Sequence, residues 1–104
     1  RYLAEGVRRD EFPEIDFRDG ALGRRAGLSG TRLDVWQVLE TVRAHDNSID
    51  EAAEYLDLPA QRVRAAVRYA AAYPDEISDI ATREASAAAR AEELWHAEQN
   101  LLHS

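Results

Sequence analysis

The stretch that most constrains the fold of this chain is residues 48–69, which has the pattern of two helices joined by a tight turn. Ser48 and Glu51 have the spacing of a capping box, and this predicts a helix that begins near Ile49. Pro59 suits the first position of a second helix, where its missing N–H costs nothing. The apolar positions that recur at helical spacing are Ile49, Ala52, Ala53 and Leu56 in the first helix, and Val63, Ala66, Val67 and Ala70 in the second.

The residues around the turn favour a helix-turn-helix. Ala53 is small enough to let the second helix cross closely, and Leu56 and Leu58 flank the turn with apolar side chains. Val63 is placed to pack against the first helix. The usual turn residue is Gly, and here Asp57 occupies that place. Asp is among the few residues that tolerate a left-handed conformation, so we expect Asp57 to adopt one.

The flanking sequence predicts a short β-hairpin and a further helix before this unit. Ile15 and Phe17 alternate with polar residues, which indicates a strand, and residues 24–28 are expected to return as its partner. Asp19-Gly20 is a turn pair, and we expect residues 21–23 to lengthen the loop beyond two residues. Asp34 and Gln37 predict a second capping box, which begins a helix that ends near Ala44.

A long helix is expected from Glu76 to about Leu102, because Tyr73-Pro74 breaks the preceding helix and no Gly or Pro follows. Glu84 interrupts its apolar stripe, which comprises Ile77, Ile80, Ala81, Ala88, Ala91, Trp95 and Leu102. The outer half has no evident core to cover. We therefore expect a partner protein or a second copy to bind four large apolar residues: Leu94, Trp95, Leu101 and Leu102.

The predicted fold class is mostly α: a short N-terminal β-hairpin, a trihelical helix-turn-helix core and a long C-terminal helix. The predicted divisions are an N-terminal segment with the hairpin over residues 1–30, the core over 31–73, and the long helix over 74–104. A chain of 104 residues is long enough for one domain with one modest core.

Several classes of function find no support in the sequence. There is no Cys and no apolar run of membrane-spanning length, and we expect a cytoplasmic protein. The glycines between Gly20 and Gly30 lack the Gly-Lys-Ser/Thr of a phosphate-binding loop. Glu92 and His96 have the spacing of a metal pair without a third ligand, and Glu51 stands where a calcium loop requires Gly. We expect no enzymatic activity, catalytic residue, metal or cofactor.

Charge is distributed unevenly around the predicted turn. The net charge is −7, but residues 59–73 carry three arginines and no acidic residue. In a helix-turn-helix this second helix enters the major groove of DNA. We expect Gln61, Arg64 and Arg68 to face the groove and Arg62 to lie near a phosphate. The alternative is that these arginines form a solvated face and pair with Asp50, Glu51 or Glu54.

Several segments together resemble a small bacterial domain family. They are the run Gly30 to Trp36, residues 50–53, Leu58-Pro59, residues 63–66 and Tyr69, with 17–20 upstream and 73–77 downstream. That family has a homeodomain-like helix-turn-helix and includes VapB-type antitoxins, which are commonly encoded beside PIN-like ribonuclease toxins. The resemblance covers about residues 14–77. It implies an antitoxin of a type II toxin-antitoxin system and implies no enzymatic activity.

Two hypotheses follow. In the first, the chain is a dimeric antitoxin that neutralises a PIN-like ribonuclease through its C-terminal helix and contributes to binding of operator DNA. The homodimer would form through the hairpin of residues 14–28 or through the long helix. In the second, the trihelical core is purely structural, and the chain is a protein interaction module that does not bind DNA; the net charge of −7 favours this version.

Overall fold

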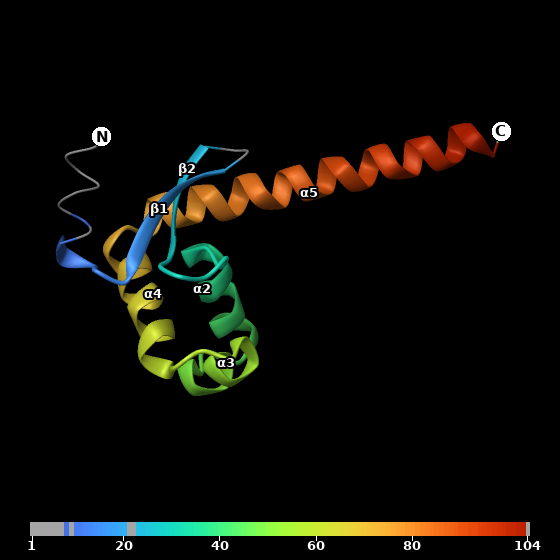
Figure 1. Ribbon diagram of the computed structural model, residues 1–104. Coiled ribbons are helices and arrows are strands. Elements are labelled where there is room, and N and C mark those ends of the chain that lie inside the picture. Colours follow the sequence, from blue (N-terminus) through green and yellow to red (C-terminus); the bar gives the residue numbers. More distant parts are fainter. Residues whose placement is uncertain (1–7, 9, 21–22, 104) are drawn as a thin grey trace.

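A computed structural model describes residues 8, 10–20 and 23–103 of the chain (Figure 1). It is mostly helical and begins with a two-stranded antiparallel sheet, which confirms the predicted fold class. The elements in chain order are β1 (Ile15–Gly20), β2 (Gly23–Leu28), α2 (Val35–Ala44), α3 (Ile49–Leu56), α4 (Ala60–Ala72) and α5 (Pro74–Leu102).

The hairpin is tighter than the sequence predicted. Ile15 pairs with Leu28, and the ladder continues without interruption to Gly20 opposite Gly23. Only positions 21 and 22 therefore separate the strands, so the expected longer loop is wrong. Gly23 has a φ of 116°, a value that a side chain disfavours, and this allows the second strand to begin one residue earlier than predicted.

The capping predictions are confirmed in part. At the start of α2 the Gln37 side chain accepts a hydrogen bond from the Asp34 N–H at 2.9 Å. At the start of α3 the Ser48 hydroxyl accepts the Glu51 N–H at 3.1 Å. The Ser48 N–H donates to the His45 carbonyl at 3.0 Å, so Glu51 does not provide the return bond that a complete capping box has.

Residues 57–59 form the turn between α3 and α4. Asp57 is left-handed, with φ 57° and ψ 48°, as its place in the turn predicted. The N–H of Leu58 donates to the carbonyl of Ala53 at 2.9 Å, which closes the end of α3. Pro59 has an extended backbone, with ψ 141°, and is the N-cap residue of α4. The helix therefore begins at Ala60, one residue later than predicted.

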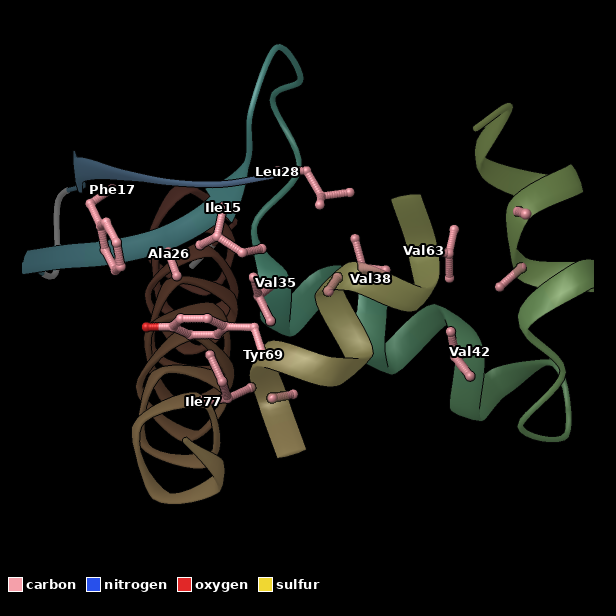
Figure 2. Close-up of a cluster of buried hydrophobic side chains, with 14 residues drawn as sticks. Ile15, Phe17, Ala26, Leu28, Val35, Val38, Val42, Val63, Tyr69 and Ile77 are labelled. Carbon is pink, nitrogen blue, oxygen red and sulfur yellow. The ribbon is translucent and has the colours of Figure 1, made fainter. Parts of the chain in front are cut away.

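Tyr69 lies at the centre of the core, where the hairpin, α2, α4 and α5 meet (Figure 2). Phe12 and Phe17 contact its ring edge-on, with centroids 5.3 and 6.1 Å away. Small residues on both helices line the α3–α4 contact, and Ala52 and Ala66 have no exposed surface. The other fully buried large side chains are Leu28, Val35, Val38 and Val63.

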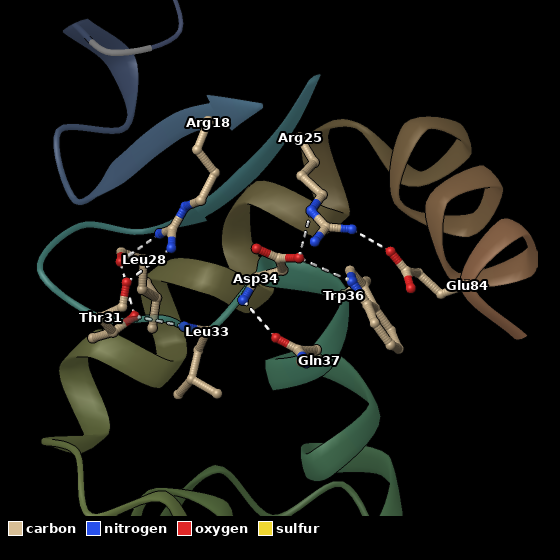
Figure 3. Close-up of polar contacts among 9 residues, drawn as sticks. All are labelled: Arg18, Arg25, Leu28, Thr31, Leu33, Asp34, Trp36, Gln37 and Glu84. Atoms are coloured by element: carbon tan, nitrogen blue, oxygen red, sulfur yellow. Dashed lines mark hydrogen bonds and ion pairs between the residues drawn. The ribbon is translucent and has the colours of Figure 1, made fainter. Parts of the chain in front are cut away.

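Four side chains join β2 and the start of α2 to α5 (Figure 3). Asp34 is 4% exposed, and its Oδ2 lies 2.9 Å from Arg25 Nε and 3.3 Å from Trp36 Nε1. The same Arg25 also donates to the carboxylate of Glu84 on α5. Glu84 therefore interrupts the apolar stripe for a structural reason, because it fixes the direction in which α5 leaves the domain.

Candidate functional site

The exposed face of α4 is the first candidate surface. Gln61, Arg64 and Arg68 are all exposed, and their spacing of three and four residues puts them on one face of the helix. The buried residues Val63, Ala66 and Ala70 hold the opposite face against the core. The structure therefore brings these three predicted DNA-contacting residues together on one solvent-exposed face.

Arg62, the fourth predicted residue, points elsewhere. It is half-buried, donates to the carbonyl of Ser29 and lies 3.9 Å from the carboxylate of Glu14. These contacts join α4 to the two ends of the hairpin. The arrangement thus fixes the orientation of α4 and separates Arg62 from the face that carries Arg64 and Arg68.

Acidic residues of α3 lie near this face without neutralising it directly. Asp50, Glu51 and Glu54 are exposed, and α3 packs against α4. In the part of the chain that the structure describes, no ion pair joins these carboxylates to Arg64 or Arg68. Both guanidinium groups are therefore available to an anionic ligand such as a DNA phosphate.

The outer half of α5 is the second candidate surface. Leu94, Trp95, Leu101 and Leu102 are between 53% and 76% exposed, whereas Ile77 and Ile80 at the start of the helix are buried. Figure 1 shows α5 extending well past the hairpin and α2, with its C-terminal end far from the rest of the domain. The four predicted partner-binding residues thus lie together on the part of α5 that covers no core of its own.

Tyr69, Glu76 and Arg8 form a polar cluster on the side of the core. The Tyr69 hydroxyl donates to Glu76 at 2.7 Å and accepts from Arg8 at 3.1 Å, while Arg8 stacks on the Tyr73 ring at 4.0 Å. Burial of the hydroxyl, reinforced by the hydrogen bond to Glu76, raises the pKa of Tyr69 well above its usual range. This phenol therefore stays protonated and structural at neutral pH.

The glutamate and histidine that have metal-pair spacing, Glu92 and His96, are exposed, and their nearest side-chain atoms lie 3.6 Å apart. Among the described residues, no group of three or more His, Asp or Glu side chains is arranged to hold a metal ion. Over the same residues, no helix combines the length and the apolar character that crossing a membrane requires.

A clamp that the sequence analysis missed holds the loop before α2. Arg18 donates to the carbonyls of Thr31 at 2.8 Å and Leu28 at 3.0 Å (Figure 3). The Thr31 hydroxyl donates to Leu28 at 2.8 Å and accepts the Leu33 N–H at 3.1 Å. The sequence alone offers no direct signal for this clamp, because Arg18 lies opposite Arg25 only once the strands pair, and like charges placed opposite each other then require partners elsewhere.

Residues 15–70 match a family described as protein of unknown function, DUF433. The chain belongs to the DUF433 family. The matched segment runs from the hairpin to α4, so it contains the Arg18–Thr31 clamp and the arginine-bearing face of α4. It ends before α5, and the predicted partner-binding residues, which lie between positions 94 and 102, are therefore outside the DUF433 segment. No curated protein and no solved structure matches the chain.

Proposed function

We propose that this DUF433 protein is an antitoxin of a type II toxin-antitoxin system. In this proposal the outer half of α5 binds and neutralises a PIN-like ribonuclease, and the DUF433 segment is a homeodomain-like, VapB-type helix-turn-helix that contributes to operator binding. The protein acts in the cytoplasm as a homodimer and has no enzymatic activity of its own. The resemblance of its Gly30 to Trp36 run and of the other segments named above to a domain family that includes VapB-type antitoxins supports this assignment.

The observation that carries the proposal is the exposed apolar end of α5. A helix end that displays Leu94, Trp95, Leu101 and Leu102 to solvent exposes more apolar surface than a helix without a partner favours. Amphipathic helices commonly bind by laying such residues into an apolar groove of another protein. Trp at the centre of an interface is a frequent binding hot spot, and Trp95 is the expected anchor.

The exposed face of α4 supports the DNA-binding half of the proposal. Arg64 and Arg68 form no ion pair within the described chain, and Gln61 lies on the same face. Arg and Gln can make bidentate contacts to base edges, each contributing about 1–3 kcal/mol of discrimination. Because Arg62 is already bound to Ser29 and Glu14, we expect its contribution to be the orientation of α4.

A second candidate function is a protein interaction module that does not bind DNA. The observation that favours it is the exposed acidic face of α3, together with the net charge of −7. Phosphate repulsion would then oppose the approach of α4 to a duplex. This version retains the role of α5 and removes only the role of α4.

One double variant, Arg64→Glu with Arg68→Glu, distinguishes the two candidate functions. If α4 contacts DNA, the dissociation constant of the variant for operator DNA should rise at least ~100-fold in a fluorescence anisotropy titration, because two attractive contacts become repulsive. Arg43→Glu with Arg90→Glu makes the same charge change away from α4 and should bind nearly as the parent does. If both double variants lost operator affinity equally, or if neither lost any, the interaction module that does not bind DNA would be the remaining candidate.

Co-expression tests the antitoxin itself. The ribonuclease encoded beside this chain should arrest growth when expressed alone, and expression of the chain should restore growth. Rescue should fail for Trp95→Ala, because the anchor of the proposed contact is gone, and persist for the Arg64/Arg68 variant. A chain that never restores growth, although it is soluble and helical, would be inconsistent with the antitoxin function.

A further inference from the structure

We propose that two copies of this chain pair through antiparallel α5 helices, so that the outer half of each helix lies along the inner half of the other. The occupant of the exposed face of α5 in the isolated protein is thus a second copy. This inference deepens the proposed function, in which the chain acts as a homodimer, because it names the helix that forms the dimer and the direction of pairing.

The first observation is a repeat of seven residues along α5. Apolar residues occupy two columns without exception, namely Ile80, Ala87, Leu94 and Leu101 in one and Ala81, Ala88, Trp95 and Leu102 in the other. The column between them holds Ile77, Glu84, Ala91 and Glu98. Seven residues are slightly fewer than two full turns of a straight α-helix. Two helices that keep a strict repeat of seven in contact therefore coil around each other. The columns continue from Ile80, which is buried against the domain, to Leu102 at the far end.

The second observation is the distribution of side-chain size, which fixes the direction of the partner. The inner half of the exposed columns is made of Ala87 and Ala88, and the outer half of Leu94, Trp95, Leu101 and Leu102. A parallel pair would put large residues against large and leave the alanine half loosely packed. An antiparallel pair, with its two-fold axis near Ala91, sets Trp95 of one copy against Ala88 of the other, and large and small side chains interdigitate as close packing requires.

The third observation is a groove between α2 and α5 at the end of the inner half. Trp36 and Leu39 line it from α2, and Ala81 and Ala85 from α5, around a volume of about 530 Å³. Trp36 and Leu39 are only partly buried. The proposed pairing places Leu102 of the second copy at this end of the groove, where it would cover apolar surface that the chain leaves partly exposed.

The charges along the proposed pair are mixed. From residue 88 onward α5 carries three glutamates and one arginine. Beside its inner half, the hollow between β2 and α5 is lined by Arg24, Arg25 and Arg83 with a single acidic residue, Glu84. Glu98 of the second copy would lie opposite Glu84, which is a like-charge pair, and only the Arg25 guanidinium that already binds the Glu84 carboxylate offsets their repulsion. The acidic end of each helix thus approaches arginines that already pair with Asp19, Asp34 and Glu84, so side-chain size and not charge sets the direction of the pair.

Light scattering coupled to size-exclusion chromatography tests the pairing on the unmodified chain, from roughly 1 to 100 µM. We expect a mass of twice 11.7 kDa that falls on dilution. Trp95→Glu should raise the dimer dissociation constant at least ~10-fold. Trp95 contacts only the neighbouring His96 ring among the described aromatic contacts, so its replacement leaves the core intact. Leu102→Glu should act in the same direction.

Asn100→Glu is the matched control, because it changes the charge by the same amount in the same half of α5 but on the opposite helix face. It should remain dimeric, with circular dichroism showing equal helix content in all three variants. A parent chain that is monomeric throughout the concentration range would overturn the proposal. Equal weakening by Trp95→Glu and Asn100→Glu would overturn it as well.

Single cysteines decide the direction of pairing, because the chain has none of its own. In the antiparallel dimer, Ala91→Cys should cross-link with itself under oxidation. Ala85→Cys and Glu98→Cys should cross-link only when the two variants are mixed. Self-cross-linking of Ala85→Cys would indicate a parallel pair and overturn the proposed arrangement.

Discussion

At the scale of single residues, the turn between α3 and α4 depends on Asp57. This residue is held at φ 57°, where a side chain is strained, and its carboxylate stands at the C-terminal end of α3, where the helix dipole disfavours a negative charge. Asp57→Gly removes both effects and should raise the free energy of unfolding by about 1 kcal/mol in urea titrations.

Two further substitutions separate these effects. Asp57→Asn removes the charge and keeps a residue that tolerates the left-handed region, so it should recover part of the gain. Asp57→Val should destabilise by about 1–2 kcal/mol, because a branched side chain opposes this conformation. If Asp57→Gly were less stable than the parent, the backbone account of this turn would be incorrect.

Tyr69 is the second residue on which stability depends. Its hydroxyl donates to Glu76 and accepts from Arg8, so Tyr69→Phe should cost about 1.5–3 kcal/mol of unfolding free energy, as for hydrogen bonds to charged groups. The effect should also depend on pH. The folded pKa is raised above the unfolded value of about 10, so the unfolded state loses its proton first and stability falls as pH rises above that value.

The measurement for Tyr69 is the difference in urea stability between parent and Tyr69→Phe at neutral pH and above pH 10. The difference should shrink at high pH, because the parent loses this contribution while the phenylalanine variant has none to lose. A difference that stays constant through the alkaline range would mean that the phenol does not titrate in the way its burial implies.

At the scale of elements, periodicity and capping residues were enough to predict most of the fold. Alternation at Ile15 and Phe17 predicted a strand, Ser48 the start of α3, and Asp57 the left-handed turn. These signals are local, and local backbone chemistry decides them. The extent of the hairpin ladder was missed because it depends on pairing up to Gly20 and Gly23, which is a property of two strands together.

Predicting the contacts of single arginines was harder for the same reason. The spacing of Gln61, Arg64 and Arg68 alone predicts that they share a helix face, and in the structure all three are exposed on one face of α4. Arg62 follows the same spacing rules but reaches residues 14 and 29, far away in the sequence. Likewise, Glu84 looked like an interruption until the hairpin brought Arg25 to it. Long-range polar contacts leave no periodic trace in the sequence.

The contact between α3 and α4 depends on small side chains where the helices pack. Ala53 is 5% exposed and lies where the two helices cross, so Ala53→Leu should force them apart and destabilise by about 1–3 kcal/mol. Glu54→Leu places the same side chain one position along on the exposed side and should change stability by less than about 0.5 kcal/mol. Thermal unfolding of the two variants compares them directly, and equal shifts would argue against close crossing at Ala53.

At the scale of the whole molecule, the chain divides into a DUF433 segment and a helix beyond it. The segment of residues 15–70 builds most of the core and presents the arginines of α4. The first part of α5 packs on it through Ile77 and Ile80 and binds Arg25 through Glu84, and the rest of α5 then leaves it. The molecule is 56 Å long in its largest dimension and 23 Å in its smallest, and α5 accounts for that elongation.

The same face of α5 serves both proposals. A second copy would cover Leu94, Trp95, Leu101 and Leu102 in the free protein, and a ribonuclease that binds these residues would compete with it. Binding of the ribonuclease would then convert a symmetric dimer into a complex in which each α5 is separately occupied. Mass action therefore makes the apparent affinity for the ribonuclease depend on the concentration of the chain.

The most direct measurement is calorimetric titration of this chain with the PIN-like ribonuclease proposed as its toxin, for the parent, for Trp95→Ala and for the control Asn100→Ala. We predict tight binding by the parent and the control, and a dissociation constant at least ~10-fold weaker for Trp95→Ala, because the central aromatic anchor is lost. Absence of binding by a folded parent, or equal affinity for all three chains, would contradict the claim that the outer half of α5 is the toxin-binding part of this protein.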